Sequence, residues 1–360
     1  MAKIKKTPLN NVHKELGAKL IDFGGWEMPV HYTSIIKEHN AVRNKVGLFD
    51  VSHMGELKVS GEGALENLEY LLTNNISSLK IGKATYTLMC NNDGGIKDDF
   101  LVYRIAENEY LLIVNAANIE KDFNWIKGHL DEKAKVENLS ENYGLLALQG
   151  PKSEEILEKL TNVDLDEINY FHFVEDKVAD KNTIISRTGY TGETGFEIYC
   201  DSDDLVELWE KIYETGQEFG LKPAGLGARN TLRLEKKLCL YGNDIDEKTN
   251  PLEAGLNFAV KLDKKDFIGK DKLLKVKDDG IDRKLIGFKL IDRGIPRHGY
   301  DINKGDVKIG TVTSGSFSPS LEENIGLGYV EKDEAKIDNE IDIIIRNRKV
   351  KAKIIKTPFV

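Results

Sequence analysis

Apolar residues recur every three or four positions in several segments of the chain. Such spacing places them on one face of a helix and predicts an amphipathic helix. The segments with this spacing are residues 65–72, 119–130 and 205–213.

Strand-like runs lie between and after these segments. Three β-rich runs separated by short polar turns fill residues 84–115, and they predict a three-stranded meander. Further strands are predicted at residues 144–149, 183–188 and 196–200. Strands and helices do not alternate regularly, which favours an α+β fold over a doubly wound sheet.

A charge-rich segment marks a predicted domain boundary. In residues 261–284, 15 of 24 residues are charged, which is typical of a solvated helix and linker. Beyond it, residues 285–360 hold short, partly alternating runs joined by turns, so a small β-barrel or sandwich is expected. The predicted domains are therefore 1–284, with the meander in a subdomain of roughly 52–140, and 285–360.

The meander groups polar residues on one face. With the second turn centred on Asn108, Leu101 lies opposite residue 115, and strand alternation then fixes which side chains share a face. Tyr86, Asp99, Tyr103 and Asn115 project from one face in this register, and Asp98 projects from the other. A one-residue slip in either hairpin would reverse the assignment.

This face makes Asp99 the candidate catalytic group. An ionised carboxylate near a reacting amine can accept a proton or stabilise a cationic iminium. The competing interpretation is that Asp98 and Asp99 flank a glycine turn and serve only as hydrogen-bond acceptors there.

Other motifs are less informative. Residues 189–197 form a glycine-spaced turn that leads to Glu197 but lacks the ending of a phosphate-binding loop. Arg229 and Arg233 lie one helical turn apart and could face one anionic ligand, although surface ion pairing is the commoner use of such a pair. His53 has no paired Cys or Asp spacing and is expected to be structural.

Composition narrows the class of protein. The 360-residue chain has 51 Lys and Arg against 60 Asp and Glu, and the net charge of -9 disfavours nucleic acid as a partner. Neither a signal peptide nor an apolar run long enough to cross a membrane is visible. Three scattered cysteines predict neither disulfides nor a zinc site and fit the cytoplasm.

Several segments resemble the glycine cleavage T-protein family, and the resemblance runs along essentially the whole chain. The two hallmark segments are Asp22-Phe23-Gly24-Gly25-Trp26-Glu27-Met28-Pro29-Val30 and Gly47-Leu48-Phe49-Asp50-Val51-Ser52-His53-Met54-Gly55-Glu56. Similar stretches follow at residues 94–99, 114–118, 148–151, 189–197, 223–229 and 314–319.

The resemblance implies a three-domain fold: two interleaved α+β folate-binding domains around a central channel, and a C-terminal β-barrel. It implies an aminomethyltransferase that takes the aminomethyl group from the dihydrolipoyl arm of lipoylated H protein. The one-carbon unit passes to tetrahydrofolate as the 5,10-methylene derivative, and ammonia is released. The family uses neither metal nor flavin.

The resemblance also assigns roles to single residues. Asp99 matches the aspartate that acts on the folate nitrogen and the substrate amine, Glu197 matches the carboxylate that pairs with the pterin, and Arg229 matches the guanidinium near the glutamyl tail. The positions that match or neighbour the rest of the folate pocket are Tyr86, Asn115, Tyr190, Met54 and Tyr241.

The chain departs from the family pattern at Lys97, which replaces an apolar residue, at Asn230, which replaces an aspartate, and at its short C-terminus. Two other functions remain open. One is a tetrahydrofolate-dependent demethylase that acts on another donor. The other is a non-enzymatic folate-binding accessory protein of iron-sulfur maintenance, although residues 237–243 lack the glycine that precedes the cysteine in its motif.

Overall fold

The computed structural model describes residues 4–360, and the chain divides into two compact units. The first unit comprises the described residues up to Leu68 together with Ile76–Tyr86 and Phe100–Asn230. The second comprises Glu69–Asn75, Thr87–Asp99 and Thr231–Val360. Each unit is therefore assembled from segments that are distant in sequence.

A six-stranded sheet forms the centre of the first unit. Its strand order is β10-β11-β12-β9-β3-β13, and neighbouring strands are antiparallel except for the parallel pair β3 and β13. The strands are β3 (Gly47–Asp50), β9 (Tyr143–Gln149), β10 (Phe173–Val178), β11 (Lys181–Ser186), β12 (Gly195–Asp201) and β13 (Lys222–Pro223). The predicted strands at residues 144–149, 183–188 and 196–200 correspond to β9, β11 and β12.

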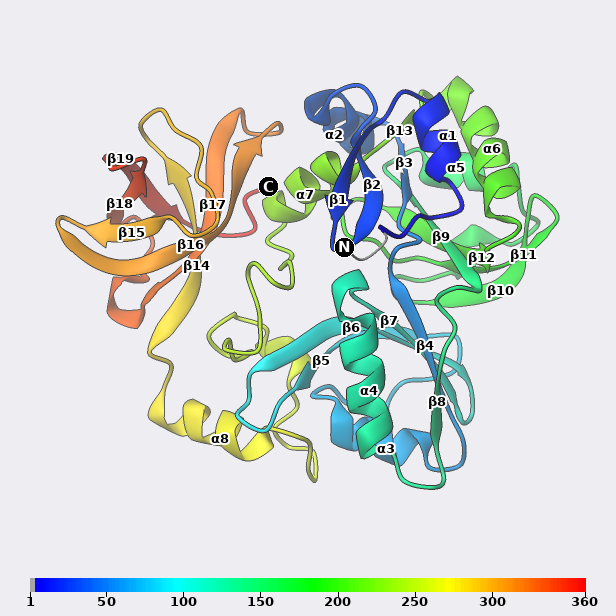
Figure 1. The fold of residues 1–360 in the computed structure, drawn as a ribbon, viewed down its shortest axis with the longest axis horizontal. Coiled ribbons are helices and arrows are strands. Elements are labelled where there is room, and N and C mark those ends of the chain that lie inside the picture. The colour runs from blue at the N-terminus through cyan, green and yellow to red at the C-terminus, as the bar shows by residue number, and fades with distance from the viewer. Residues whose placement is uncertain (1–3) are drawn as a thin grey trace. The chain divides into compact units, whose positions relative to one another are not determined.

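Three helices cover one face of this sheet (Figure 1). They are α1 (Asn10–Glu15), α5 (Ser153–Leu157) and α6 (Leu205–Gly216). In α6, Leu205, Leu208, Trp209 and Ile212 recur at helical spacing and are buried. Burying each such side chain stabilises the fold by about 1.5–3 kcal/mol, so the helix is held by its packed face. The amphipathic helix predicted at residues 205–213 is confirmed.

A five-stranded antiparallel sheet contains the predicted meander. Its order is β5-β6-β7-β4-β8. The strands are β4 (Gly55–Ser60), β5 (Ala84–Cys90), β6 (Ile96–Ala106), β7 (Glu109–Val114) and β8 (Lys135–Asn138). Helices α3 (Ala64–Leu71) and α4 (Ile119–His129) fall where the other two amphipathic helices were predicted. The meander and both helices are confirmed.

The pairing of β6 with β7 differs from the predicted register by two residues. Leu101 lies opposite Ile113 instead of residue 115, and the register shifts between Arg104 and Ala106. Because side chains alternate with a period of two, a two-residue difference keeps every side chain on its predicted face. Asp99 and Tyr103 therefore still share one face of β6.

Shorter elements complete the chain up to the barrel. Strands β1 (Lys19–Phe23) and β2 (Trp26–His31) form a separate hairpin. The remaining helices are α2 (Ile35–Asn44), which Ser34 caps, α7 (Leu226–Glu235) and α8 (Lys270–Asp279). The 3-10 turns are η1 (Ala116–Asn118), η2 (Leu165–Glu167), η3 (Gln217–Phe219) and η4 (Asn257–Ala259).

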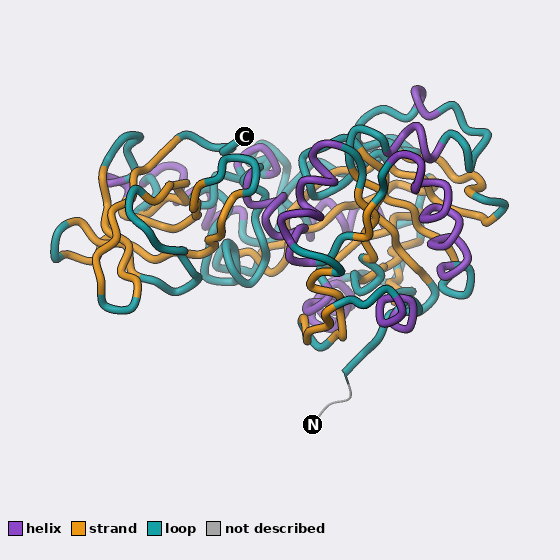
Figure 2. The backbone as a smooth tube through the Cα atoms, turned by 90° about the horizontal axis from the view of Figure 1, so that it is seen from above, coloured by secondary structure: helices purple, strands orange, loops and turns teal. Residues whose placement is uncertain are grey.

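A closed six-stranded barrel forms much of the second unit. Its order is β14-β17-β16-β15-β18-β19, and Ile and Val side chains fill its interior. A 3-10 turn, η5 (Lys332–Glu334), lies between β17 and β18. Figure 2 colours the backbone by secondary structure and shows the strands in orange and the loops that join them in teal. The strands are β14 (Arg283–Leu290), β15 (Asp301–Lys304), β16 (Val307–Ser318), β17 (Glu323–Glu331), β18 (Glu340–Ile345) and β19 (Arg348–Ile355). The α+β fold class with a C-terminal β-barrel is confirmed.

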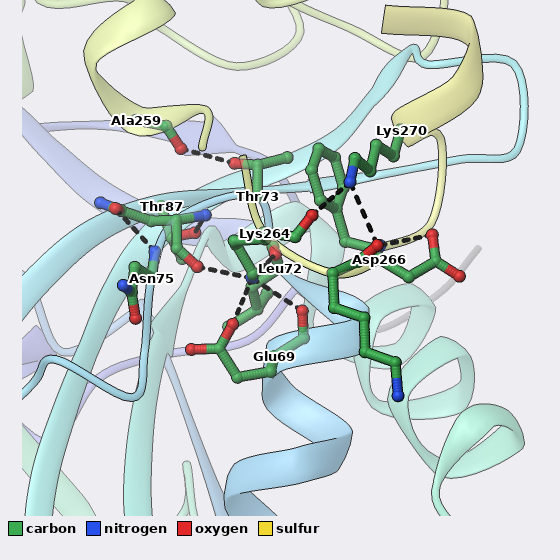
Figure 3. Close-up of polar contacts among 12 residues, drawn as sticks. Glu69, Leu72, Thr73, Asn75, Thr87, Ala259, Lys264, Asp266 and Lys270 are labelled. Atoms are coloured by element: carbon green, nitrogen blue, oxygen red, sulfur yellow. Dashed lines mark hydrogen bonds and ion pairs between the residues drawn. The ribbon is translucent and has the colours of Figure 1, made fainter. Parts of the chain in front are cut away.

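The charge-rich segment before the barrel is only partly the solvated helix that was predicted. Helix α8 lies there, but the side chain of Lys264 is just 6% exposed. Its ammonium group donates to the backbone oxygens of Glu69, Leu72 and Asn74 at 2.7–2.8 Å (Figure 3). It also pairs with the Glu69 carboxylate at 2.7 Å. A lysine can therefore satisfy the carbonyl groups at the C-terminal end of α3.

Candidate functional site

Glu197 is the most enclosed of the predicted site residues. It lies in β12, it is 8% exposed, and its Oε2 accepts a hydrogen bond of 2.6 Å from the Thr188 hydroxyl. Burial raises the pKa of this carboxyl, whereas the bond from Thr188 and the charge of Arg229 act in the opposite direction. The Thr188 hydroxyl and the Arg229 charge therefore stabilise the ionised carboxylate, which burial keeps away from water.

Arg229 provides the cation beside Glu197. Its guanidinium lies 4.7 Å from the centre of the Tyr190 ring, which is a cation–π distance. Burial lowers the pKa of Arg229, and the Glu197 charge opposes this shift. An arginine keeps its proton under such a shift because its ordinary pKa exceeds 12. Glu197, Arg229 and Tyr190 thus form one cluster in the first unit.

A buried carboxylate fixes the start of the helix that carries Arg229. Glu38, which is fully buried, accepts from the Tyr32 and Thr33 amides at 2.8 Å through one oxygen. Its other oxygen accepts from the Gly225 amide at 3.0 Å, just before α7 begins. The end of β2 and the start of α7 are therefore joined through one side chain.

The glycine-spaced segment before β12 is shaped by Gln149. The Gln149 amide donates to the Thr188 carbonyl at 3.1 Å and accepts from the Thr191 hydroxyl at 2.8 Å. A Cβ atom at Gly189 or Gly195 would lie 2.0 or 2.6 Å from that side chain, so a larger residue at either position would require Gln149 to move. The glycines let the turn close around Gln149, and Tyr190 then lies beside Arg229.

The hallmark segment at residues 47–56 contributes Met54, which is half-buried and whose amide donates to the Val51 carbonyl at 3.1 Å. Beside it, His53 is buried and contacts the Phe23 ring edge-on with centres 5.7 Å apart. Burial, with a smaller effect from Arg229, lowers the pKa of His53 to about 4. A neutral, enclosed imidazole agrees with the structural role expected from the sequence.

Two further predicted residues lie in the first unit. Tyr86 is a half-buried residue of β5, and Asn115 is half-buried directly after β7, where the 3-10 turn η1 begins. Partial exposure leaves both side chains open to contact with a ligand.

The two adjacent aspartates differ sharply in accessibility. Asp98 is 0% exposed, whereas Asp99 is half-buried. In the second unit, Tyr241 donates to the Ile96 carbonyl at 3.1 Å. Burial raises the pKa of the Cys239 thiol, and the Asp99 charge adds to that rise. The loop that carries Cys239 and Tyr241 therefore packs along the start of β6.

Lys97, an unusual neighbour of Asp99, has an acidic partner. Its ammonium lies 3.3 Å from the Glu247 carboxylate in the second unit. Glu247 is about half exposed, so the pair contributes little to stability.

Arg233, which lies one turn after Arg229 in α7, is held by buried partners. Arg233 is buried in the second unit and forms a 2.6 Å ion pair with Asp244. It also donates to Ser314 at 2.8 Å and to the Leu238 carbonyl at 3.1 Å. Surface ion pairing is therefore wrong for Arg233, because its ion pair with Asp244 is buried.

The predicted residues therefore fall into two groups. Tyr190, Glu197 and Arg229 form the cluster described above, and Met54, Tyr86 and Asn115 belong to the same unit. Asp99 and Tyr241 belong to the second unit.

Sequence reasoning placed Tyr103 on the polar face of the meander but missed the other hydroxyl groups behind Glu197. Hydrogen bonds join Tyr103 to the buried residues Thr188, Ser186 and Tyr199. Strand alternation offered a signal, because Glu197 and Tyr199 are two residues apart in one predicted strand, as are Ser186 and Thr188 in another.

Two searches of the described residues bear on the class of protein. Residues 4–360 contain no group of three or more His, Cys, Asp or Glu side chains arranged to hold a metal ion. Within the same residues, no helix has the length and apolar character that crossing a membrane requires. All three cysteines are buried and free.

Known families and proteins match this chain over nearly its whole length. The GCVT N-terminal domain model matches residues 9–264, and the glycine cleavage T-protein C-terminal barrel model matches residues 283–360. Aminomethyltransferases from Halothermothrix orenii and Bacillus subtilis are 57% and 49% identical, and each alignment covers 99% of this chain and at least 99% of the relative. A crystal structure of the glycine cleavage system aminomethyltransferase T from Bartonella henselae matches with a TM-score of 0.93 at 35% identity, over 99% of this chain and 98% of that one. The chain belongs to the glycine cleavage T-protein family.

Proposed function

We propose that the chain is a tetrahydrofolate-dependent aminomethyltransferase of the glycine cleavage system. Relatives that carry the name aminomethyltransferase align over nearly the full length of both proteins, which supports this reaction. The overall step is R–S–CH2–NH2 plus tetrahydrofolate giving 5,10-methylenetetrahydrofolate, ammonia and R–SH. The transferred carbon keeps its oxidation level, so the proposed step requires neither a flavin nor a redox metal.

Tetrahydrofolate binding is assigned to the cluster around Glu197. The pterin presents planar N–H donors, and a carboxylate accepts two parallel N–H bonds through its two oxygens. The enclosed Glu197 carboxylate, with Thr188 and Arg229 beside it, is the single observation that carries this assignment. Arg229 suits the anionic glutamyl tail, and the remaining pocket contacts are assigned to Met54, Tyr86, Asn115, Tyr190 and Tyr241.

Asp99 is assigned the catalytic role. Its partial exposure leaves it accessible, whereas Asp98 is closed off. As a carboxylate it takes a proton from the attacking folate nitrogen or stabilises the iminium that forms when ammonia leaves.

The donor of the one-carbon unit is the lipoylated H protein, and the reaction is placed in the cytoplasm. The chain's negative charge and the absence of a membrane-spanning helix among residues 4–360 fit a small-molecule and protein partner. We assign the chemistry to residues 1–284 and regard residues 285–360 as a separate domain, since the barrel has its own apolar core.

The decisive experiment combines the purified protein, tetrahydrofolate and H protein loaded with the aminomethyl group. Production of methylenetetrahydrofolate and ammonia in equal amounts is expected, and a protein that produces neither is not an aminomethyltransferase. Supplying methylated donors in place of H protein tests the demethylase alternative. Folate binding without turnover on any donor would instead identify the accessory protein.

Asp99→Asn tests the catalytic assignment. The amide cannot accept a proton and carries no charge, so kcat should fall by roughly 10²–10⁴ while folate affinity stays within about threefold. Asp98→Asn is the matched control, and its kcat should stay within tenfold of the wild type. Equal losses of kcat in the two variants would refute the role of Asp99.

A further inference from the structure

A chain of hydroxyl groups lies behind Glu197, in the interior of the first unit. Tyr199 donates to the Tyr103 oxygen at 3.1 Å, and Tyr103 lies 3.0 Å from Ser186 and 3.2 Å from Thr188. Thr188 lies 3.0 Å from Ser186 and donates to Glu197 at 2.6 Å. All four hydroxyl-bearing residues are at most 2% exposed, so water does not compete for these bonds.

The proton count gives this chain a direction. Each hydroxyl has one proton, so Thr188 cannot donate to Ser186 and to Glu197 at once. Its proton goes to the carboxylate, because that bond is shorter and charge-assisted. Tyr103, which already accepts from Tyr199, then donates either to Thr188 directly or to Ser186, which in turn donates to Thr188. In both arrangements an unbroken path of donors leads from Tyr199 to Glu197.

A buried acid, Glu56, lies near the far end of the hydroxyl chain. Tyr199 lines a cleft of about 570 Å³ together with Tyr143. Glu56 of β4 is 1% exposed, and neither of its carboxyl oxygens has a hydrogen-bond partner in the structure of residues 4–360. Burial raises the pKa of Glu56 well above its ordinary value, and ionised Glu56 would raise the pKa values of Tyr143 and Tyr199. An uncompensated buried carboxyl stays protonated at neutral pH. The series of hydroxyl groups therefore has a negative charge, that of Glu197, at one end only.

We propose that Thr188, Ser186, Tyr103 and Tyr199 are positioning residues that hold Glu197 as an ionised carboxylate with both oxygens available as acceptors. The inference rests on the proposed folate binding. It adds that these hydroxyl groups select the ligand by keeping Glu197 a hydrogen-bond acceptor. The site takes planar heterocycles that present two adjacent N–H donors, and it rejects those that present an acceptor to Glu197. Hydrogen bonds that follow one another polarise one another, so even Tyr199, which does not touch Glu197, contributes to stabilising its carboxylate.

Other titratable groups near Glu197 do not account for a change in folate binding with pH. Arg229 on α7 keeps its charge throughout, and burial, with a smaller effect from the Glu197 charge, raises the pKa of Tyr170. Burial also raises the pKa values of Tyr103 and Tyr199, so both phenols stay protonated. His53, with a pKa of about 4, does not titrate between pH 5 and 9. A change in folate binding over that range therefore reports on Glu197.

The test measures the dissociation constant of tetrahydrofolate between pH 5 and 9 under anaerobic conditions. Tyr199→Phe removes one oxygen that Glu197 does not touch, and Tyr143→Phe is the matched control because Tyr143 lines the same cleft outside the chain. In Tyr199→Phe we expect affinity at pH 7 to weaken roughly three- to tenfold, and the acid-side loss of binding to move up by several tenths of a pH unit. Thr188→Val should shift both quantities further, and Tyr143→Phe should shift neither.

The outcomes separate the inference from the proposed function. If the wild-type protein does not bind tetrahydrofolate, the proposed function fails. If it binds but Tyr199→Phe gives the wild-type pH profile, or Tyr143→Phe gives the same shift, the positioning role is wrong. Thermal unfolding identifies variants that have lost their fold. Glu56→Gln should leave the profile unchanged, because it replaces one neutral group with another, and a large shift would overturn the view that only Glu197 is charged.

Discussion

Replacing Lys264 with methionine tests how much one buried cation contributes to the second unit. Methionine keeps most of the length of the side chain but cannot donate a hydrogen bond. The substitution leaves the carbonyl oxygens of Glu69, Leu72 and Asn74 without the donor that now lies 2.7–2.8 Å away. It also leaves the Glu69 carboxylate without the ion pair that the structure records at 2.7 Å.

The magnitude follows from the number and kind of these contacts. A hydrogen bond from a charged group contributes about 1.5–3 kcal/mol, and removing one partner of a buried ion pair costs about 3–5 kcal/mol. The contacts share one ammonium group and are not additive, and Glu69 is partly exposed and can be resolvated. We therefore expect a loss of about 3–4 kcal/mol, at the lower end of the range for a buried pair.

Urea denaturation and hydrogen exchange together measure this loss. Lys265→Met is the matched control because Lys265 is the exposed neighbour in the same segment. Two amides report locally: that of Ile268, which donates to Tyr70, and that of Lys261, which donates to Thr73. Both should exchange faster in Lys264→Met. Equal stabilities of the Lys264 and Lys265 variants, within about 0.5 kcal/mol, would refute the reasoning.

Two other predictions concern buried charge. The pKa of His53 is about 4 in the folded protein and 6.5 ordinarily, so the unfolded chain binds the extra proton between these values. The free energy of unfolding should therefore be unaffected by His53 above pH 6.5 and fall by about 3 kcal/mol as the pH drops to 4. In His53→Gln, the urea midpoints should lose this part of their pH dependence. A pH dependence equal to that of the wild type would contradict the prediction. Asp244→Asn should destabilise the protein by about 3–5 kcal/mol in denaturant titrations, because it leaves the buried Arg233 guanidinium uncompensated. The same change at the exposed Asp306, which pairs with Lys349, should have no measurable effect, and similar losses at both positions would rule out the buried pair as the cause.

The sequence was most informative where local periodicity decides the structure. The helices at residues 119–129 and 205–216 follow from their apolar spacing, and the meander follows from three β-rich runs. Even the wrong register of β6 against β7 kept the polar face of the meander, because the difference was two residues.

Contacts between distant segments could not be predicted in the same way. Nothing near Lys264 in the sequence indicates that its partners lie at residues 69–74, and the neighbours of Arg233 gave no sign of Ser314. For the candidate site, resemblance to a family supplied Glu197 and Arg229. The hydrogen bonds that link Tyr103 of β6 to Ser186 of β11 and Tyr199 of β12 join strands of two different sheets, so the sequence did not indicate them.

The division of the chain into two units has a consequence for its synthesis. The segments Glu69–Asn75 and Thr87–Asp99 leave the ribosome long before Thr231–Val360, the segment with which they form the second unit. Domains made of one continuous segment can fold as they emerge. Here the first part of β6, including Asp99, can pair with its neighbour strands early, but its contacts with Thr231–Val360 form only after the C-terminal third of the chain has been made. A ribosome stalled before residue 231 would therefore hold a nascent chain in which the second unit around Asp99 is incomplete.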